Sequence, residues 1–519
     1  MARVLVTETI AASGLDLLRR AGHEVDVAEG LDPGSLLERI VGAHALIIRS
    51  ATKVTAEVIE AASDLIVIGR AGVGIDNVDV DAATEHGVMV VNAPESNILS
   101  AAEQAMALIL AQARNVPQAH AALVAGRWER SRWEGVELHG KTLGIVGLGR
   151  VGTLVAQRAL AFGMRLVAYD PYVSVDRARH LGVELLSLDE LVAEADFVTV
   201  HLPKNAETLG LIGAELLARS KPGIRFVNTA RGGIVDEAAL AEAIASGRVG
   251  GAGLDVFAEE PTTESPLFAL DSVVVTPHLG ASTVEAQDKA GVTIAEQVLL
   301  ALAGEFVPFA VNVAASGVAE SVKPFMALVE QLGRFFGCLH ERVPDVLEVQ
   351  VEGAIGAERN DILTLCALKG LFATSTEEPV SYVNAPQMAA RRGLIVRETS
   401  SSTAGEYVNL VTLRSAVHSV SGTVTAGGAR IVSVDDLPIE VAPSPHMLVI
   451  RNDDRPGMIG VVGTVLGDAG VSIRSMALAP KNEETTALMV LSVDLDPPDE
   501  VVAALGARSG ILGVDRVRL

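Results

Sequence analysis

A glycine-rich turn in the first half of the chain constrains the fold more than any other feature. The run LGIVGLGRVG, residues 143–152, spaces Gly147, Gly149 and Gly152 as G-x-G-x-x-G between a strand-like and a helix-like segment. These glycines permit a tight turn, leave the backbone open to a pyrophosphate and let the helix pack closely on the strand. Free N–H groups and the helix dipole favour an anion at this point. The turn therefore predicts a dinucleotide site in a parallel α/β sheet.

The next strand indicates which dinucleotide is bound. RLVAYDP, residues 165–171, ends in Asp170, which lies 18 positions after Gly152, at the spacing expected for a carboxylate that binds the adenosine ribose. No arginine directly follows this acid to neutralise a 2′-phosphate. We therefore expect NAD rather than NADP.

Length and charge narrow the class of protein. The 519 residues exceed what one hydrophobic core supports, so two to four domains are expected. The formal net charge of −24 argues against nucleic acid as a partner and demands a locally basic pocket for an anionic substrate. No apolar run is long enough to span a bilayer and no signal-peptide pattern opens the chain, so we expect a cytoplasmic protein without a membrane partner. Cys338 and Cys366 lie in apolar helical runs and are expected to be buried and reduced, and we expect no metal site.

Hydrophobic patterning divides the chain into four parts. Alternating strands and helices predict an α/β fold with two doubly wound parallel-sheet domains. These are a discontinuous substrate-binding domain of residues 1–97 and 284–313 and a Rossmann NAD-binding domain of residues 98–283, which begins with a helix from Ser100 to near Pro117. Residues 314–443 are predicted to form a mixed α/β intervening domain, and residues 446–519 follow the ferredoxin-like order βαββαβ.

Three motifs after the glycine turn carry candidate catalytic groups. VNTARGGIVDE supplies Arg231, GLDVFAEEP supplies Glu260 and TPHLGAST supplies His278. Strand ends of an open parallel sheet converge on one crevice. There an Arg would hold a carboxylate through two hydrogen bonds, and a His would take a hydroxyl proton while a Glu orients its ring. Spacing alone leaves open a solvated Glu260 and a structural His278.

These motifs, together with YDP and HLP, resemble the D-isomer-specific 2-hydroxyacid dehydrogenases. Within that family, IIRSATKVT, IGRAGVGIDNVD and NAPESNILSAAE resemble the members that act on 3-phosphoglycerate. ILTLCALKGLF and YVNAPQMAARRG are similar to the intervening domain of their long form, and DRPGMIGVVGTVL with AGVSI is similar to a C-terminal ACT domain. The resemblance implies NAD-dependent oxidation of 3-phospho-D-glycerate to 3-phosphohydroxypyruvate, the first committed step toward L-serine, by a homotetramer or homodimer.

The resemblance also implies roles for individual residues. Arg231 would clamp the substrate carboxylate, and His278 would be the general acid/base with Glu260 as its partner. Besides the three glycines, the implied NAD contacts are Arg150, Val151, Asp170, Thr229, Ala230, Asp255, Gly280 and Ala281. The implied contacts to the phosphorylated substrate are Arg49, Ser50, Arg70, Val73 and Asn97, with Arg130 reaching this active site or a neighbour's.

An effector site is expected in the last domain. NDDRPG turns from a strand into a helix and exposes backbone N–H groups to a carboxylate. The resemblance implies L-serine bound between two such domains, and the candidate contacts are Asn452, Asp454 and Ser472. Ser472 stands in GVSI, where related domains usually read GVNI, and a hydroxyl replaces an amide that donates and accepts at once. Control by L-serine and a domain that only builds the oligomer both remain open.

Two other functions remain open as well. One is a dehydrogenase for another 2-hydroxy acid, such as glyoxylate or 2-hydroxyglutarate; Arg49, Arg70 and Arg130 favour a substrate with a second anionic end. The other is an NAD-sensing binding protein built on the same core. The two additional C-terminal domains and the substrate arginines disfavour that second alternative.

Overall fold

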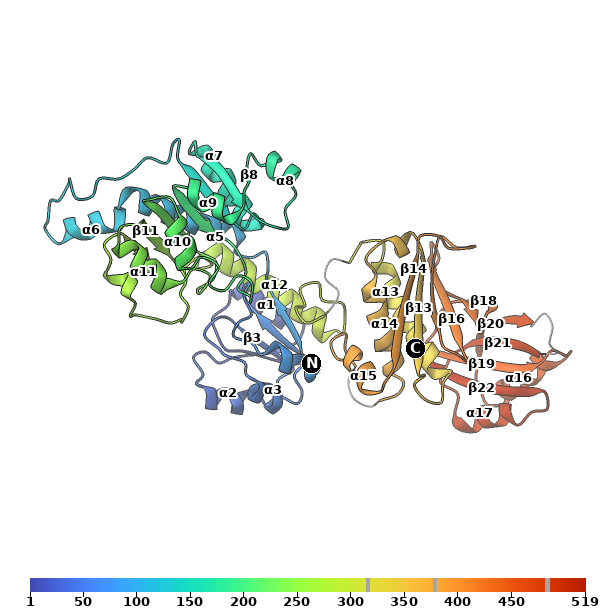
Figure 1. Ribbon diagram of the computed structural model, residues 1–519. Helices are drawn as coiled ribbons and strands as arrows, with labels where there is room; N and C mark the ends of the chain where they lie inside the picture. The colour runs from blue at the N-terminus through green and yellow to red at the C-terminus, as the bar shows by residue number, and fades with distance from the viewer. Residues whose placement is uncertain (314–317, 377–379, 481–485) are drawn as a thin grey trace.

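The computed structural model describes residues 1–313, 318–376, 380–480 and 486–519. It contains four sheets, two in each of two lobes (Figure 1). The first lobe holds the sheets built from residues 3–92 and 142–275, and the second holds those built from residues 346–441 and 446–518. The predicted α/β class with two parallel sheets, a mixed sheet and a small ferredoxin-like sheet is confirmed.

The first sheet has five parallel strands in the order β2-β1-β3-β4-β5. The strands are β1 (Arg3–Val6), β2 (Glu24–Val27), β3 (Ala45–Ile48), β4 (Val67–Arg70) and β5 (Met89–Asn92), joined by α1 (Ala12–Arg20), α2 (Pro33–Ile40), α3 (Ala56–Ala61) and α4 (Val80–Glu85). Helix α12 (Val284–Leu302) returns from far along the chain and packs on α1 and β4. A Cβ on Gly14 would lie 2.5 Å from the Gly291 carbonyl oxygen, so these small residues let α1 and α12 approach closely.

The second sheet has seven parallel strands in the order β12-β11-β10-β9-β6-β7-β8. The strands are β6 (Thr142–Val146), β7 (Arg165–Tyr169), β8 (Glu184–Leu185), β9 (Phe197–Val200), β10 (Ile224–Asn228), β11 (Val249–Leu254) and β12 (Val273–Val275). The helices are α5 (Ile98–Arg114), α6 (Val116–Val124), α7 (Arg150–Ala161), α8 (Val175–His180), α9 (Leu188–Glu194), α10 (Ala214–Arg219) and α11 (Glu237–Ala245), with a 3₁₀ turn η1 (Pro266–Ala269). The strand order reverses between β6 and β9, and ligands of such sheets bind beyond the strand ends at this point.

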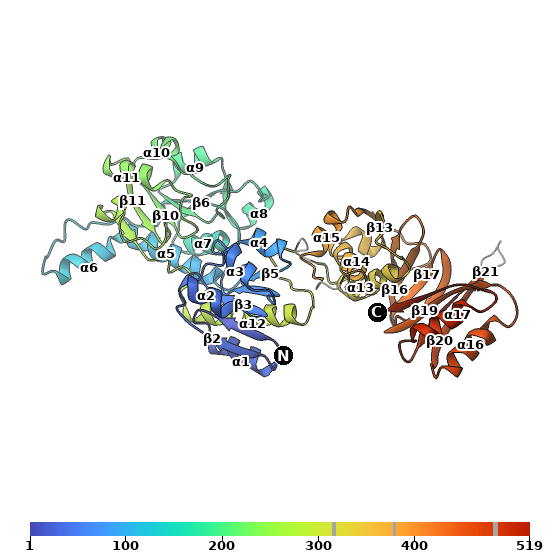
Figure 2. The same ribbon diagram turned by 90° about the horizontal axis from the view of Figure 1, so that it is seen from below.

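One helix boundary differs from the sequence-based expectation. The helix predicted from Ser100 to near Pro117 ends at Asn115, which adopts φ 52°, and a further helix, α6, which was not predicted, follows directly. Pro117 lies in the first turn of α6 instead of ending a helix, because a first-turn residue needs no N–H donor. Helix α6 and the segment after it project from the lobe (Figures 1 and 2).

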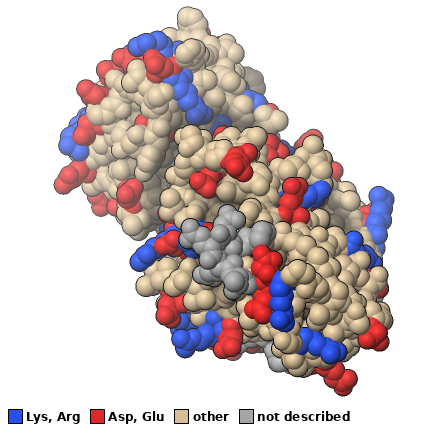
Figure 3. Space-filling view, turned by 90° about the vertical axis from the view of Figure 1, so that its right-hand side faces the viewer, with Lys and Arg blue, Asp and Glu red and all other residues tan. Residues whose placement is uncertain are grey.

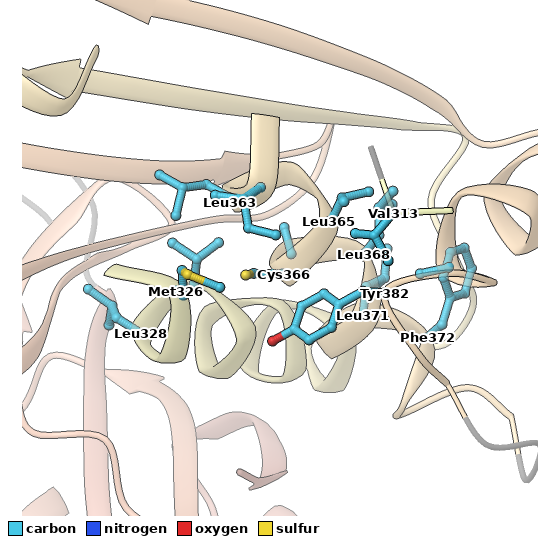
Figure 4. Packing of buried hydrophobic residues seen from close by; sticks show 14 of the residues in the cluster. Val313, Met326, Leu328, Leu363, Leu365, Cys366, Leu368, Leu371, Phe372 and Tyr382 are labelled. Carbon is cyan, nitrogen blue, oxygen red and sulfur yellow. The ribbon is translucent and has the colours of Figure 1, made fainter. Parts of the chain in front are cut away.

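The third sheet is mixed, in the order β14-β13-β15-β16-β17-β18, and only β13 and β14 pair in parallel. Its strands are β13 (Val346–Gly353), β14 (Ile395–Ser401), β15 (Asn409–Arg414), β16 (Ser419–Thr425), β17 (Gly428–Val434) and β18 (Leu437–Val441); its helices are α13 (Lys323–Cys338), α14 (Asp361–Phe372) and α15 (Ala385–Arg391), with a 3₁₀ turn η2 (Ala354–Ala357). Cys366 lies among leucines between α13 and α14 (Figure 4), and this burial raises the pKa of its thiol to about 12. Cys338 is free as predicted but only partly buried.

The fourth sheet is antiparallel, in the order β20-β21-β19-β22. Its elements are β19 (His446–Asp453), α16 (Met458–Asp468), β20 (Ile473–Pro480), β21 (Thr486–Val493), α17 (Asp499–Gly506) and β22 (Ile511–Arg518), which is the predicted βαββαβ order. On the face shown in Figure 3, basic and acidic side chains lie interspersed on a largely uncharged surface. Within the described residues, no helix has both the length and the apolar character of a membrane span.

Candidate active site

The glycine turn lies at the reversal point of the second sheet, directly after β6. Gly147 has φ 97°, and a Cβ there would lie 2.9 Å from the His201 carbonyl oxygen. A Cβ on Gly152 would lie 2.1 Å from the Gly147 carbonyl oxygen, so neither position accepts a side chain. At Gly149 no atom lies within 4 Å of the position a Cβ would take, so its backbone faces open space. The three glycines therefore have the three separate functions that a pyrophosphate-binding turn requires.

Asp170 follows β7 and lies beside this turn. Its Oδ2 accepts a hydrogen bond from Leu148 N at 2.8 Å, and its Oδ1 accepts one from Tyr172 N at 2.9 Å. Each carboxylate oxygen has further acceptor capacity. Asp170 is thus held in place by the glycine turn and can still accept hydrogen bonds from ribose hydroxyls.

The turn after β10 contributes an unsatisfied polar group. Asn228 shapes this turn, because its Oδ1 accepts from Ala230 N at 3.0 Å and its Nδ2 donates to the Arg231 carbonyl at 2.9 Å. The Thr229 hydroxyl is buried without a hydrogen-bond partner in the described part of the chain. A buried hydroxyl of this kind has hydrogen-bonding capacity that a ligand group can satisfy. Together with the open backbone at Gly149, it fits a bound dinucleotide.

Asp255, fully buried after β11, organises the loop that carries His278. Its Oδ1 accepts from Leu279 N at 2.7 Å and from the Thr276 hydroxyl at 2.5 Å, while Oδ2 accepts from Gly280 N at 2.7 Å. Sequence reasoning assigned Asp255 to the cofactor alone. The contacts within the chain add an anchoring role for the loop of residues 276–280.

His278 and Glu260 form a direct pair. His278 Nδ1 lies 2.6 Å from Glu260 Oε2, and the other carboxylate oxygen accepts Phe257 N at 2.8 Å. Burial by itself would raise the pKa of Glu260, but the hydrogen bonds from His278 and Phe257 N outweigh it and lower the pKa below its ordinary value. Because an ionised Glu260 can only accept, the Nδ1–H of His278 donates to it, and Nε2 is left as the acceptor. His278 holds φ 55°, a conformation that non-glycine residues adopt mainly where the surrounding structure imposes it.

Arg231 reaches across to the first sheet. A Cβ on Gly74 would lie 2.3 Å from Arg231 Nη2, so the guanidinium lies directly against the glycine of the loop after β4. Arg231 Nε lies 3.4 Å from Asp76 of the same loop. The side chain is 29% exposed, and its Nη1 donates to the Ala230 carbonyl. A planar cation is therefore fixed between the two sheets with one edge open to ligand.

These groups line one cleft of about 270 Å³. The predicted site residues in its lining are Arg70, Val73, Asn97, Arg231, Glu260, His278 and Ala281. The lining residues that sequence reasoning missed as site residues are Gly74, Asp76, Lys204, Gly232, Phe257 and Ala258. Lys204 directly follows the HLP motif, which is the only sequence signal that pointed toward it.

Arg70 gives the cleft its basic character. Its side chain folds over Gly72, where a Cβ would lie 1.7 Å from Arg70 Nη1, and its Nε is buried without a partner among the described residues. Burial and the neighbouring charge of Arg231 lower the pKa of Arg70 to about 10. Two guanidinium groups held close to each other attract an anion, because an anion relieves their repulsion.

Arg49 and Ser50 lie on a loop beside the cleft instead of in its lining. Glu8, at the end of β1, holds this loop by accepting Arg49 N at 2.8 Å, Thr52 N at 2.9 Å and Ala51 N at 3.1 Å. Burial by itself would raise the pKa of Glu8, but these N–H donors outweigh it and lower the pKa. Sequence reasoning missed Glu8, since its partners are backbone groups of another strand end.

Other predicted residues lie at the margins. Arg150 is exposed at the start of α7, and its guanidinium forms an ion pair at 3.0 Å with Glu95, which lies after β5 of the first sheet. Val151 follows Arg150 on the same helix. Arg130 is exposed on the projecting segment after α6 and does not line the cleft of its own chain. It remains available to a second chain.

The three predicted effector residues do not meet within one chain. Asn452 is 1% exposed, and its Oδ1 is buried with no partner among the described residues. Asp454 is exposed, and Ser472 donates its N–H to Asp494 at 2.8 Å. Asn452 pairs with Ala487 at one end of β21, whereas the strand after Ser472 begins opposite Val493 at the other end, about 20 Å away.

Comparison with known proteins agrees with this geometry. Family models match residues 106–280 as the D-isomer-specific 2-hydroxyacid dehydrogenase NAD-binding domain, residues 321–435 as the D-3-phosphoglycerate dehydrogenase intervening domain and residues 446–510 as an ACT domain. The D-3-phosphoglycerate dehydrogenase of Mycobacterium tuberculosis is 51% identical over 513 residues, which cover 97% of each chain.

Solved structures also resemble this chain over about 60% of its length. The TT0316 protein from Thermus thermophilus is 41% identical with a TM-score of 0.56, covering 60% of this chain and 99% of that one. The D-lactate dehydrogenase of Aquifex aeolicus, complexed with NAD and lactic acid, is 27% identical with a TM-score of 0.52, covering 58% of this chain and 96% of that one. With the full-length similarity and the three matched domains, these findings show that the chain belongs to the D-3-phosphoglycerate dehydrogenases, a branch of the D-isomer-specific 2-hydroxyacid dehydrogenase family.

Proposed function

We propose that the chain oxidises 3-phosphoglycerate at C2 to 3-phosphohydroxypyruvate with NAD. The observation that carries the proposal is the convergence of Arg231, Arg70 and the Glu260–His278 pair on one cleft. The family to which the chain belongs is named for this activity. In this reading the cleft binds a small acid with two anionic ends and removes one proton from its hydroxyl group.

Each protein group then has one task. Arg231 holds the substrate carboxylate through its planar fork, which fixes the adjacent C2 relative to the cofactor site. His278 Nε2 accepts the hydroxyl proton, and Glu260 stabilises the imidazolium that results. NAD, when held by the glycine turn, Asp170 and Thr229, supplies the hydride acceptor. General base assistance of this kind is typically worth ~10²–10⁴-fold in rate.

The second anionic end selects the substrate. Arg70 lies in the cleft close enough to Arg231 for their charges to interact, and Arg49 also acts on it electrostatically. A phosphate at C3 would meet this basic cluster, with Arg130 of a second chain as a further contributor. D-glycerate lacks the phosphate and leaves Arg70 without an anion. Glyoxylate has only one anionic end, so it uses less of this site.

We further propose that the ACT domain binds an amino acid, with L-serine as the expected effector. Because Asn452 and Ser472 lie at opposite ends of β21, one effector site needs residues of two chains, as in a homodimer or homotetramer. The unpartnered Asn452 Oδ1 supports a ligand at that end.

NADH formation tests the proposed reaction. Initial rates are compared for 3-phosphoglycerate, D-glycerate and D-2-hydroxyglutarate with NAD, at one pH and ionic strength. We expect the highest kcat/KM for 3-phosphoglycerate. A higher kcat/KM for 2-hydroxyglutarate would indicate a dehydrogenase for another 2-hydroxy acid. If none of the three acids gives NADH although NAD still binds, the result would favour an NAD-sensing protein.

A further inference from the structure

Glu237 makes a contact that helix capping does not explain. It is the first residue of α11, at the end of the VNTARGGIVDE motif, and the neighbouring Asp236 already caps that helix by accepting Ala239 N at 3.0 Å. The Glu237 side chain instead reaches a distant loop, where Oε1 accepts Ala258 N at 2.5 Å.

That loop carries the partner of the catalytic base. Phe257 N and Ala258 N are consecutive donors: the first binds Glu260 and the second binds Glu237. The same motif touches the loop a second time, because a Cβ on Gly232 would lie 1.8 Å from the Phe257 carbonyl oxygen. The segment that carries Arg231 therefore holds the Glu260 loop at two points, one steric and one a hydrogen bond to a charged group.

Glu237 lies within electrostatic reach of Glu260, whose charge acts on it. Burial and, in the same direction, the charge of Glu260 raise the pKa of Glu237, against the Ala258 N–H, which lowers it. Helix α10, which packs on α11, carries two exposed charged residues, Glu215 and Arg219. Arg219 forms an ion pair with Asp189. The other charged groups that act on Glu237 or Glu260 are Asp236, Lys204, Arg231 and His278. The Asp255 carboxylate at the end of β11 is bound to the 276–280 loop.

We propose that Glu237 is a positioning residue that fixes the Glu260 loop through Ala258 and whose charge sets the pH at which the Glu260–His278 pair gives up its proton. The catalytic part of this inference rests on the proposed function, in which His278 is the general base. A negative charge next to the pair favours retention of the proton. Removing that charge lets the pair release its proton at lower pH.

The test separates charge from hydrogen bond. Glu237→Gln keeps an acceptor for Ala258 N but removes the charge; Glu237→Ala removes both. Glu242→Gln is the matched control, because it removes one charge from an exposed position of the same helix. Two readouts are measured across pH: kcat/KM for NADH formation, and the rate at which diethyl pyrocarbonate modifies His278, quantified in its peptide by mass spectrometry. The second readout needs no turnover, so failure of the proposed function does not obscure it.

We expect both midpoints to fall by about 0.5 pH unit in Glu237→Gln and in Glu237→Ala. Glu242→Gln should stay at the wild-type value. At the high-pH plateau, kcat of Glu237→Ala should fall about tenfold, as for a lost hydrogen bond to a charged group, and Glu237→Gln should recover most of that loss. A Glu237→Gln midpoint equal to that of the control overturns the electrostatic part. Wild-type kcat in Glu237→Ala, with wild-type thermal unfolding, overturns the positioning part.

Discussion

The active-site cleft and the effector site of the ACT domain were both predicted from short motifs, but the fold brings the predicted residues together only in the cleft. In the cleft, residues from six strand ends of two sheets meet within one chain, and His278 lies 2.6 Å from Glu260 although 18 positions separate them. In the ACT domain, Asn452 lies in β19 and Ser472 directly precedes β20 of the same small sheet, yet the two residues lie at opposite ends of β21. Parallel strands gather their carboxyl ends at one edge, whereas antiparallel strands alternate their ends. The first arrangement completes a site within a chain, and the second needs a partner.

The largest expected effect on activity follows from removing the general base of the cleft, the site that one chain completes by itself. His278→Ala should lower kcat about 10²–10⁴-fold, because no other group accepts the hydroxyl proton at that position. NADH binding, measured by fluorescence titration, should be unchanged, since the glycine turn and Asp170 do not contact His278. Turnover within a few-fold of wild type would contradict the assigned role.

A substitution of Arg70 tests whether the cleft recognises the phosphate of the substrate. Arg70→Gln should raise KM for 3-phosphoglycerate about 10–100-fold, as expected for a lost charged hydrogen bond, and change KM for D-glycerate much less. Lys53→Gln is the control, because Lys53 is an exposed cation of the same domain that does not line the cleft. Equal losses for both substrates would show that Arg70 does not select the phosphate.

If the effector site of the ACT domain is shared between two chains, inhibition by L-serine depends on oligomer formation. L-serine should inhibit NADH formation at concentrations of protein that keep chains associated, and inhibition should vanish on dilution below the dissociation constant of the oligomer. Ser472→Asn should lower the half-inhibiting serine concentration about 5–10-fold, because the amide restores a hydrogen bond worth about 1 kcal/mol. Inhibition that persists in a separated chain, checked by analytical ultracentrifugation, would contradict a site shared between chains.

The smallest expected effect concerns how the cleft loop is held. The folded pKa of Glu8 lies below its ordinary value of 4.5. Its carboxylate therefore stabilises the fold above that value, and the contribution is lost as the pH falls through the folded pKa. Glu8→Gln should lower the unfolding temperature by a few degrees at pH 7 and raise KM for 3-phosphoglycerate a few-fold. The difference from wild type should shrink as the pH falls below 4.5 and through the folded pKa of Glu8; a constant difference would show that the charge is not the cause.

Much of the cleft was predictable because its chemistry is local in sequence. Gly147 needs a positive φ, Asp170 ends the next strand, and Arg231, Glu260 and His278 each follow a strand of one parallel sheet. The organising contacts were not predictable. Glu8 and Asp255 bind backbone N–H groups of distant loops, and backbone groups leave no mark in the sequence. The break at Asn115 was missed for a similar reason, since a single left-handed residue interrupts an otherwise helical pattern.

The sequence by itself determined the order of elements and the dinucleotide turn, and it supplied the candidate reacting groups, because strand periodicity, glycine conformations and the chemical type of each side chain are properties of short segments. Tertiary structure alone decided which of those groups meet. It brought Gly74 against Arg231, placed Arg70 beside a second cation, tied Glu237 to the loop of Glu260 and separated Asn452 from Ser472. Such contacts depend on how strand ends and sheets are arranged in space, which no local pattern specifies.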